Sequence, residues 1–257
     1  METPNTVTCK NCGNIFTGNF CNICGQKVIN SRFLFKQILI DFFEATFNLD
    51  KGFFFTLILL LTNPKKVINE YLSGRTKRYF NPIKYLIIIA GLSALIVIAT
   101  KSFDKNLDVV NSISSDEISS VGLKIINFMK SYINIIMLML VPFFAFSFKL
   151  FFLRTKLNYT EHLIINCYAF GTGILIINIP SLIFAFINGV SHLQTVIGFI
   201  IQITVYAYFY HKLANRKLII DILAAITAFF LGMIFMTLAY ILLMQLIILI
   251  LVNLSLL

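Results

Sequence analysis

The sequence predicts an all-α integral membrane protein: a bundle of about five transmembrane helices, an amphipathic interfacial helical region and a small N-terminal zinc ribbon. Three observations support this fold class. Hydrophobic residues make up 58% of the chain and charged residues 12%, with a mean hydropathy of +0.87. That balance excludes an ordinary soluble domain. Long apolar runs fill the chain from residue 82 onward, and two Cys-x-x-Cys pairs lie near its start.

Composition divides the chain into three predicted parts. Residues 1–29 hold clustered cysteines and are expected to form the zinc ribbon. Residues 30–81 combine an amphipathic pattern with a basic stretch, which is typical of helices at a membrane surface. Residues 82–257 are apolar enough to form the transmembrane helical domain.

The ribbon prediction rests on residues 9–25, CKNCGNIFTGNFCNICG, in which eight residues separate two Cys-x-x-Cys-Gly knuckles. A two-residue gap lets both thiolates of a knuckle bind one ion, and the glycines allow the backbone to turn around it. The predicted zinc ligands are Cys9, Cys12, Cys21 and Cys24. Four thiolates leave no position for water, so a structural zinc is expected. A redox dithiol and an iron–sulfur cluster are the alternatives.

Two helical segments are expected between the ribbon and the basic stretch. Residues Arg32 to Asn48 place polar and apolar side chains on opposite faces of an amphipathic helix. The run Phe53 to Thr62 is very apolar but spans only ten residues, about half of the ~20 needed to cross a bilayer. We interpret it as an interfacial or re-entrant segment, or as a segment buried beneath other helices.

The stretch NPKKVINEYLSGRTKRYFNPIKYL, residues 63–86, predicts a short helix followed by a basic connection. Asn63 is a good N-cap, Pro64 suits the first helical position, and Ser73 with Gly74 should end the helix. Lys66 and Glu70 lie four residues apart and are expected to pair on its surface.

The basic collar of this stretch comprises Lys65, Lys66, Arg75, Lys77, Arg78 and Lys84. We expect these side chains to meet anionic lipid headgroups, with the tyrosine rings of Tyr79 and Tyr85 at headgroup depth. The collar is interpreted as a positive flank of the first span, with a lipid-headgroup or nucleic-acid site as the alternative. Because the positive charge follows the predicted membrane topology, a nucleic-acid role is not needed to explain it.

Together, the Cys-x-x-Cys-Gly ribbon, the segment DKGFFFTLILLLTNPKKVINEYLSGRTKRYFNPIKYL at residues 50–86 and the apolar runs after it are similar to a known family. The chain resembles an uncharacterised bacterial multi-pass membrane-protein family, a domain of unknown function with an N-terminal zinc ribbon of four cysteines. This resemblance covers most of the chain and implies an inner-membrane protein without an established activity.

Five spans are predicted near residues 82–100, 132–153, 163–187, 193–210 and 218–252. The last run of about 35 residues would be ~50 Å long as one helix, against a hydrocarbon core of ~30 Å. It is expected to form one long helix, with a turn near Gly232 and a sixth span as the alternative.

Charge predicts the orientation of these spans. The start, METPNTVT, has no apolar signal-peptide core, so the ribbon is expected to stay in the cytosol. The connectors RTKLNYTEH and HKLANRK are basic, whereas the loop over 101–131 has four basic and four acidic residues. Positive charge favours the cytosolic side, which predicts a multi-pass protein with a cytosolic N-terminus. The resemblance implies that this membrane is the cell inner membrane.

Several polar residues fall inside or beside the spans. Glu161 and His162 open the third span and can serve as a proton relay or as metal ligands. The alternative is helix capping: Thr160 is the N-cap, Glu161 interacts with the positive end of the helix dipole, and His162 lies at the lipid headgroups. Some members of the similar family have further histidines where this chain has Tyr168 and Phe170, which argues against an intramembrane metal site here. Further polar residues within the runs either line a polar path or hydrogen-bond neighbouring helices; they are Asn166, Asn178, Gln202, Tyr206 and Gln245.

These features predict a non-enzymatic membrane adaptor or scaffold, in which the ribbon presents a docking surface to a cytosolic or membrane protein. The expected partners also include the lipid bilayer and its anionic headgroups. A transporter or channel for a small solute or lipid is the first alternative. A membrane-embedded lipid-modifying enzyme that uses Glu161 or His162 is the second.

Overall fold

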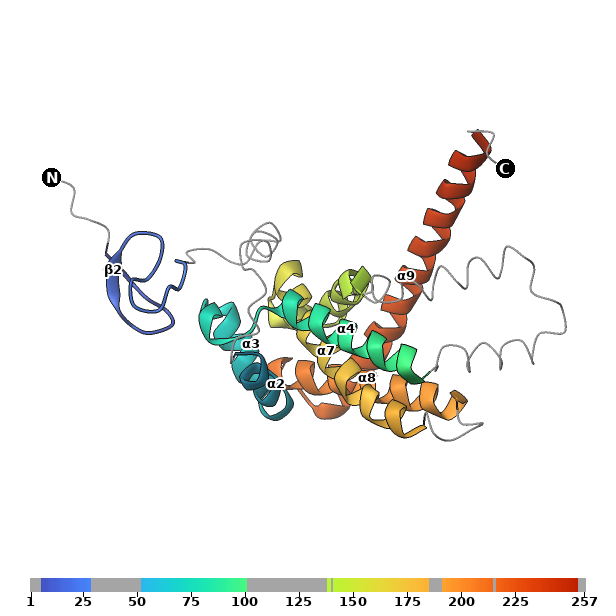
Figure 1. Cartoon of the computed structure of the whole chain (residues 1–257), viewed down its shortest axis with the longest axis horizontal. Coiled ribbons are helices and arrows are strands. Elements are labelled where there is room, and N and C mark those ends of the chain that lie inside the picture. Colours follow the sequence, from blue (N-terminus) through green and yellow to red (C-terminus); the bar gives the residue numbers. More distant parts are fainter. Residues whose placement is uncertain are drawn as a thin grey trace.

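The computed structural model describes residues 6–28, 52–100, 138–139, 141–184, 191–214 and 216–253. A small β unit lies beside a bundle of helices (Figure 1). The described elements are β1 (Thr6–Thr8), β2 (Ile15–Thr17), α2 (Gly52–Thr62), α3 (Pro64–Leu72), η1 (Thr76–Arg78), α4 (Pro82–Thr100), η2 (Leu153–Thr155), α7 (Tyr159–Phe184), α8 (Ser191–Ala214) and α9 (Leu218–Asn253). A further helix, Val141–Phe151, precedes η2.

The predicted fold class is confirmed. Among the described residues, four helical segments are long and apolar enough to cross a membrane: Thr76–Thr100, Tyr159–Ile183, Leu193–Ala214 and Leu218–Leu242. They correspond to four of the five predicted spans. The chain is therefore an all-α multi-pass membrane protein.

Some predictions fall outside the described residues. The amphipathic helix over 32–48 and the loop over 101–131 lie there entirely. Of the predicted span near 132–153, the structure describes the short apolar helix Val141–Phe151, whereas 132–137 are not described.

α7 is the central helix of the bundle. It packs against α4 on one side and α8 on the other, and α8 packs against α9 (Figure 1). α7 is buried along most of its length, whereas α4, α8 and α9 present exposed apolar side chains such as Ile98, Ile200 and Leu223. Such outward apolar faces suit contact with lipid.

α9 is one continuous helix of 36 residues, so the alternative of a turn near Gly232 is wrong. Gly232 serves a different purpose, because a Cβ built there would lie 2.6 Å from Cδ1 of Phe144. The missing side chain lets helix Val141–Phe151 pack closely against α9, and Ser147 Oγ also donates to the carbonyl of Ala228. At ~1.5 Å per residue the helix is longer than a bilayer core, and its C-terminal part extends away from the other helices (Figure 1).

The collar helix α3 forms as its sequence predicts. Asn63 is the N-cap and its side chain accepts from the backbone N–H of Lys66, with Pro64 in the first turn. Ser73 is the C-cap, and Gly74 follows with φ of 101°. Glu70, expected to pair with Lys66, instead lies 3.7 Å from both Arg75 and Arg78.

The expected position of the collar tyrosines is wrong. Tyr79 and Tyr85 are buried in the protein rather than exposed at headgroup depth. Tyr79 donates from its hydroxyl to Glu70 at 2.9 Å, and the hydroxyl of Tyr85 lies 2.9 Å from Oγ1 of Thr172 in α7. Because both rings have polar partners inside the fold, they connect the collar to its neighbours instead of anchoring it in lipid.

The segment between η1 and α4 is held by its own peptide groups. The N–H of Phe80 donates to Oγ1 of Thr56 in α2 at 2.8 Å, and its carbonyl accepts from the hydroxyl of Tyr168 in α7 at 2.5 Å. α2 itself is half-buried: Thr56 and Leu60 face inward, whereas Phe54 and Ile58 are exposed. α2 therefore has one buried face and one exposed face, so it fits both the interfacial and the buried interpretation of Phe53 to Thr62.

Substitution of Gly232 tests the packing of α9. We expect Gly232→Ala to lower the thermal unfolding midpoint in detergent or nanodiscs, because its Cβ would collide with Phe144. Overpacking of this kind typically costs about 1–3 kcal/mol. Gly91→Ala is the control, since no described atom lies within 4 Å of a Cβ built there. Equal midpoints for the two variants would contradict the close contact.

Candidate functional site

The four predicted ligand cysteines come together in the β unit, hereafter the ribbon (residues 6–28). β1 and β2 pair antiparallel, and each is followed by a knuckle. The two knuckles repeat the same backbone pattern. Gly13 donates to the carbonyl of Cys9 and Gly25 to that of Cys21, each at 2.9 Å. Gly13 and Gly25 adopt φ of 77° and 66°, a region that favours glycine.

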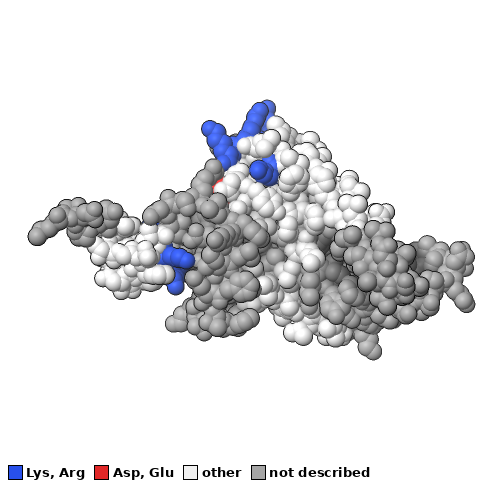
Figure 2. Space-filling view, turned by 90° about the horizontal axis from the view of Figure 1, so that it is seen from above, with Lys and Arg blue, Asp and Glu red and all other residues white. Residues whose placement is uncertain are grey.

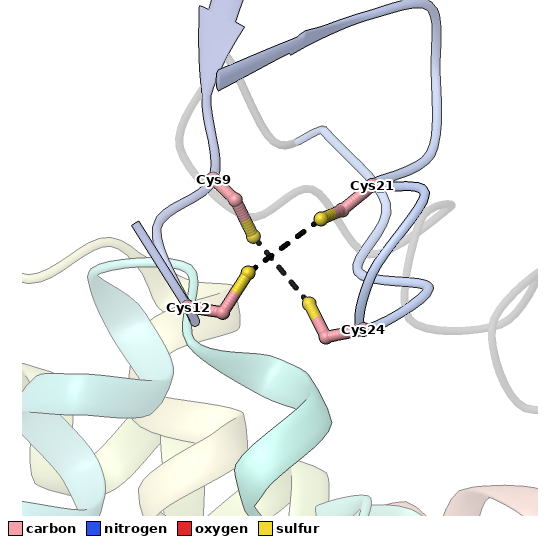
Figure 3. Close-up of side chains that lie close together, drawn as sticks. All are labelled: Cys9, Cys12, Cys21 and Cys24. Atoms are coloured by element: carbon pink, nitrogen blue, oxygen red, sulfur yellow. Dashed lines mark hydrogen bonds between the residues drawn. The ribbon is translucent and has the colours of Figure 1, made fainter. Parts of the chain in front are cut away.

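The cysteine sulfurs point toward one common centre (Figure 3). Sγ of Cys9 lies 3.5 Å from Sγ of Cys24, and Sγ of Cys12 lies 3.6 Å from Sγ of Cys21. All four sulfurs lie within 4.8 Å of one another. Sulfurs bound to one tetrahedral zinc at ~2.3 Å would be about 3.8 Å apart. The four side chains therefore fit a single metal ion.

The thiols also influence each other's protonation. Backbone hydrogen bonding, mainly from the N–H of Cys24, lowers the pKa of Cys21 to about 6. The N–H of Asn14 acts in the same direction on Cys12, but desolvation and contacts with the other three thiols raise the pKa of Cys12 to about 12. Because thiolates this close repel one another, deprotonation of all four requires a cation between them.

Gln26 fastens the ribbon to the collar. This side chain is 3% exposed; its Oε1 accepts from the N–H of Lys77 at 2.9 Å, and its Nε2 donates to Oγ1 of Thr76 at 2.9 Å. Nearby, Nε of Arg75 donates to the carbonyl of Lys10 at 2.9 Å. The sequence analysis missed this contact, because the partners lie about fifty residues apart.

The collar cations lie at the surface. Lys65, Lys66, Arg75, Lys77 and Arg78 are exposed and Lys84 is half-buried. Figure 2 shows Lys and Arg side chains in two separate places on the visible surface, at its upper edge and toward its left, beside uncharged surface. Cations at some parts of the surface and uncharged side chains elsewhere suit a protein that crosses a membrane.

Glu161 and His162 do not form one site. Asn158, not Thr160, is the N-cap of α7: its Oδ1 accepts from the N–H of Glu161 at 2.8 Å, and Glu161 Oε2 accepts from the N–H of Asn158 at 2.7 Å. This reciprocal pair is a capping box. His162 is fully buried rather than at the headgroups, and its Nδ1 lies 2.9 Å from the hydroxyl of Tyr210.

Polar side chains follow one another along the interface of α7 and α8. On α8, Gln202, Tyr206 and Tyr210 recur every four residues and share a face. On α7, Asn166 donates to the hydroxyl of Tyr210 at 2.9 Å, beside His162. We call these five residues, with Asn178 further along α7, the polar row. Of this row, the sequence analysis missed only Tyr210 as a candidate.

The polar row contains most of the unsatisfied polar atoms of the described structure. Within the described ranges, six buried side-chain nitrogen or oxygen atoms have no hydrogen-bond partner: His162 Nε2, Asn166 Oδ1, Asn178 Nδ2, Gln202 Nε2, Tyr206 Oη and Arg216 Nη2. Five of these atoms belong to the row. Such groups are costly in a bilayer and mark places where a ligand or water can bind.

A buried ionic cluster near the start of α9 also escaped the sequence analysis. The Asp221 side chain is fully buried; its carboxylate lies 2.8 Å from Nδ1 of His211 and accepts from Nε of Arg216 at 2.6 Å. The guanidinium of Arg216 also lies 4.7 Å from the centre of the Phe152 ring. The cluster joins the α8–α9 connector to the segment before α7, a structural role that Asp221 can fill because its charge is paired.

The segment that links the ribbon to the bundle matches a family model. Residues 50–93 match DUF3667, a protein of unknown function. The DUF3667 match covers α2, α3, η1 and the first part of α4, and so includes the whole basic collar. It confirms the resemblance to a domain of unknown function. Comparisons with curated proteins and with solved structures find no match.

The metal site lies outside the DUF3667 match and can be tested separately. We expect the purified chain to carry about one metal ion, and Cys21→Ser to lower the metal content several-fold because one of four ligands is lost. Metal is measured by inductively coupled plasma mass spectrometry. Cys167→Ala, which removes a buried cysteine of α7, is the control and should keep the metal. An unchanged content in Cys21→Ser would contradict the site.

Proposed function

We propose that the protein is a membrane adaptor or scaffold, in which a structural zinc ion holds the ribbon in a shape that a partner protein recognises. The observation that carries this proposal is the closed group of four cysteines in a ribbon fastened to the membrane collar through Gln26. Four thiolate ligands complete a tetrahedral zinc site, and such sites stabilise small folds rather than catalyse reactions.

The small core of the ribbon supports a structural role for the metal. Its buried hydrophobic residues are Cys9, Phe16 and Cys21, and two of the three are proposed ligands. A unit of this size buries too little apolar surface to fold stably by itself. Metal binding would supply much of its folding free energy.

The surface of the ribbon supports a protein partner. Three large apolar side chains are strongly exposed: Ile15 at 67%, Phe20 at 58% and Ile23 at 70%. Exposed aromatic and branched side chains on a small rigid unit are typical of protein contact sites, whereas nucleic-acid sites are dominated by basic groups. We infer a cytosolic or membrane protein with a complementary apolar surface.

Photo-crosslinking in native membranes tests this function. A photoreactive phenylalanine analogue at position 20 or 23 should crosslink to one discrete protein, because both side chains are exposed on the ribbon. The same analogue at Thr17, also exposed, is the control. Cys21→Ser should abolish the crosslink while the chain stays in the membrane. Crosslinks that persist after metal loss, or that are equally strong at Thr17, would contradict the adaptor.

We further propose that the ribbon and the collar face the cytosol at the bacterial inner membrane. The collar lies at the same end of the bundle as the basic α8–α9 connector, since the hydroxyl of Tyr208 donates to the carbonyl of Thr62 at 3.0 Å. Basic residues at one end favour that end as cytosolic.

A reporter at the other end tests the orientation. The five spans that the sequence predicts would put residue 257 outside the cytosol, so alkaline phosphatase fused there should be active and green fluorescent protein should be dark. If green fluorescent protein is fluorescent and alkaline phosphatase is inactive, residue 257 lies in the cytosol. The orientation of the last span, or of the whole bundle, would then be opposite to the one proposed.

A second candidate function is transport of a small solute or lipid, and the polar row favours it. Five unsatisfied polar atoms along α7 and α8 offer successive contacts through the membrane domain. Flux through liposomes containing the chain, altered by Gln202 or Asn178 substitutions, would support transport. The enzymatic alternative has weaker support, because the carboxylate of its proposed base, Glu161, caps α7.

A further inference from the structure

The membrane domain contains a cavity of about 270 Å³ beside Asn178 and Gln202 of the polar row. Residues from α4, helix Val141–Phe151, α7, α8 and α9 line it, and it is open to the surface of the bundle rather than enclosed. Most of its wall is apolar and aromatic, including Phe144, Phe170, Phe199 and Phe229. Its polar groups include Ser93, Asn178 and Gln202.

The two amides are held in place by the surrounding helices. Asn178 is 6% exposed, and its Oδ1 accepts from Oγ of Ser93 in α4 at 3.0 Å, which leaves the Nδ2 group to face elsewhere. Gln202 is 5% exposed and lies against Gly173 of α7, where a Cβ would collide with its Oε1. Neither amide nitrogen has a hydrogen-bond partner in the described part of the chain.

The chemistry of the wall defines what can bind. None of the described residues that line the cavity carries a charge, so an ion would find no counter-charge. The two unpaired groups are hydrogen-bond donors and require an acceptor. An apolar cavity of about 150 Å³ can hold a benzene molecule, so this larger cavity has room for a ring or part of a hydrocarbon chain.

We propose that this cavity binds a neutral lipophilic molecule whose carbonyl-type oxygen accepts hydrogen bonds from the amide groups of Asn178 and Gln202. The inference goes beyond the adaptor function and does not depend on it, because the cavity and the ribbon lie in different parts of the chain. It also does not require transport, since a bound molecule can remain in place.

The ligand can come from two sources that share this chemistry. Phe199 is 43% exposed and Thr195 is exposed, so the α8 side of the cavity reaches the surface of the bundle that faces lipid. The ester carbonyl of a membrane lipid can enter from there. A free lipophilic ketone or quinone dissolved in the bilayer presents the same acceptor.

The test compares bilayers with and without ester carbonyls. The full chain is placed in nanodiscs of diphytanoyl phosphatidylcholine in its ester-linked or ether-linked form, and its thermal midpoint is measured. Each sample is repeated with 2-decanone and with decane, which has a similar hydrocarbon body but no acceptor. The test variant is Asn178→Leu with Gln202→Leu. Gln245→Leu, on an exposed part of α9, is the matched control.

The double variant should fold, because replacing buried unpaired amides by leucine removes unsatisfied groups. If a lipid ester occupies the cavity, the wild-type midpoint should be roughly 2–4 °C higher in ester-linked than in ether-linked nanodiscs. If a free ligand is the source, the two lipids should be equal, and 2-decanone but not decane should raise the midpoint in ether-linked nanodiscs.

The rise in thermal midpoint, whether caused by ester-linked lipid or by 2-decanone, should persist in Gln245→Leu and disappear in the double variant. The proposal is overturned if the wild type shows neither response. It is also overturned if the double variant responds as the wild type does, because the effect would then arise elsewhere on the protein.

Discussion

The backbone of Phe80 connects the collar to the helix bundle. It lies between η1 and α4, outside any helix, and is buried. A buried residue needs hydrogen-bond partners for both its backbone N–H and its backbone carbonyl. Thr56 of α2 and Tyr168 of α7 supply these partners for Phe80. The two bonds therefore help to position the collar against α2 and the central helix α7.

The same series of contacts continues to the ribbon. Gln26 of the ribbon bonds to Thr76 and Lys77 of η1, and η1 leads within a few residues to Phe80. The candidate metal centre is therefore joined to the transmembrane helices through short polar contacts. In the adaptor that we propose, this connection would hold the docking surface in a defined orientation, which would lower the entropy cost of binding a partner.

The buried polar groups of the membrane domain fall into two classes, those with hydrogen-bond or ionic partners and those without. The carboxylates of Glu161 and Asp221 are each paired, with a helix N-terminus in one case and with His211 and Arg216 in the other. Their burial is accounted for by local structure. The polar row differs, because the unpaired atoms on His162, Asn166 and Tyr206 continue the line of the two cavity amides. Function within the membrane is therefore to be sought along α7 and α8.

The sequence by itself determined the features that depend on residues near one another in the chain. The knuckle spacing predicted that Cys9, Cys12, Cys21 and Cys24 come together, and the structure brings their sulfurs within 4.8 Å of one another. Asn63, Pro64 and Ser73 predicted the bounds of α3, and apolar runs predicted the spans, because capping and hydrophobic length are local properties.

Only the tertiary structure decided which residues distant in the chain meet. The amide of Gln26 finds η1, the rings of Tyr79 and Tyr85 turn inward, and Phe144 occupies the space above Gly232. The composition of a span shows that it is apolar but not which of its faces meets a neighbour. Asn178 and Gln202 therefore became parts of one cavity only when α7 and α8 packed together, because helix packing sets contacts that no local pattern encodes.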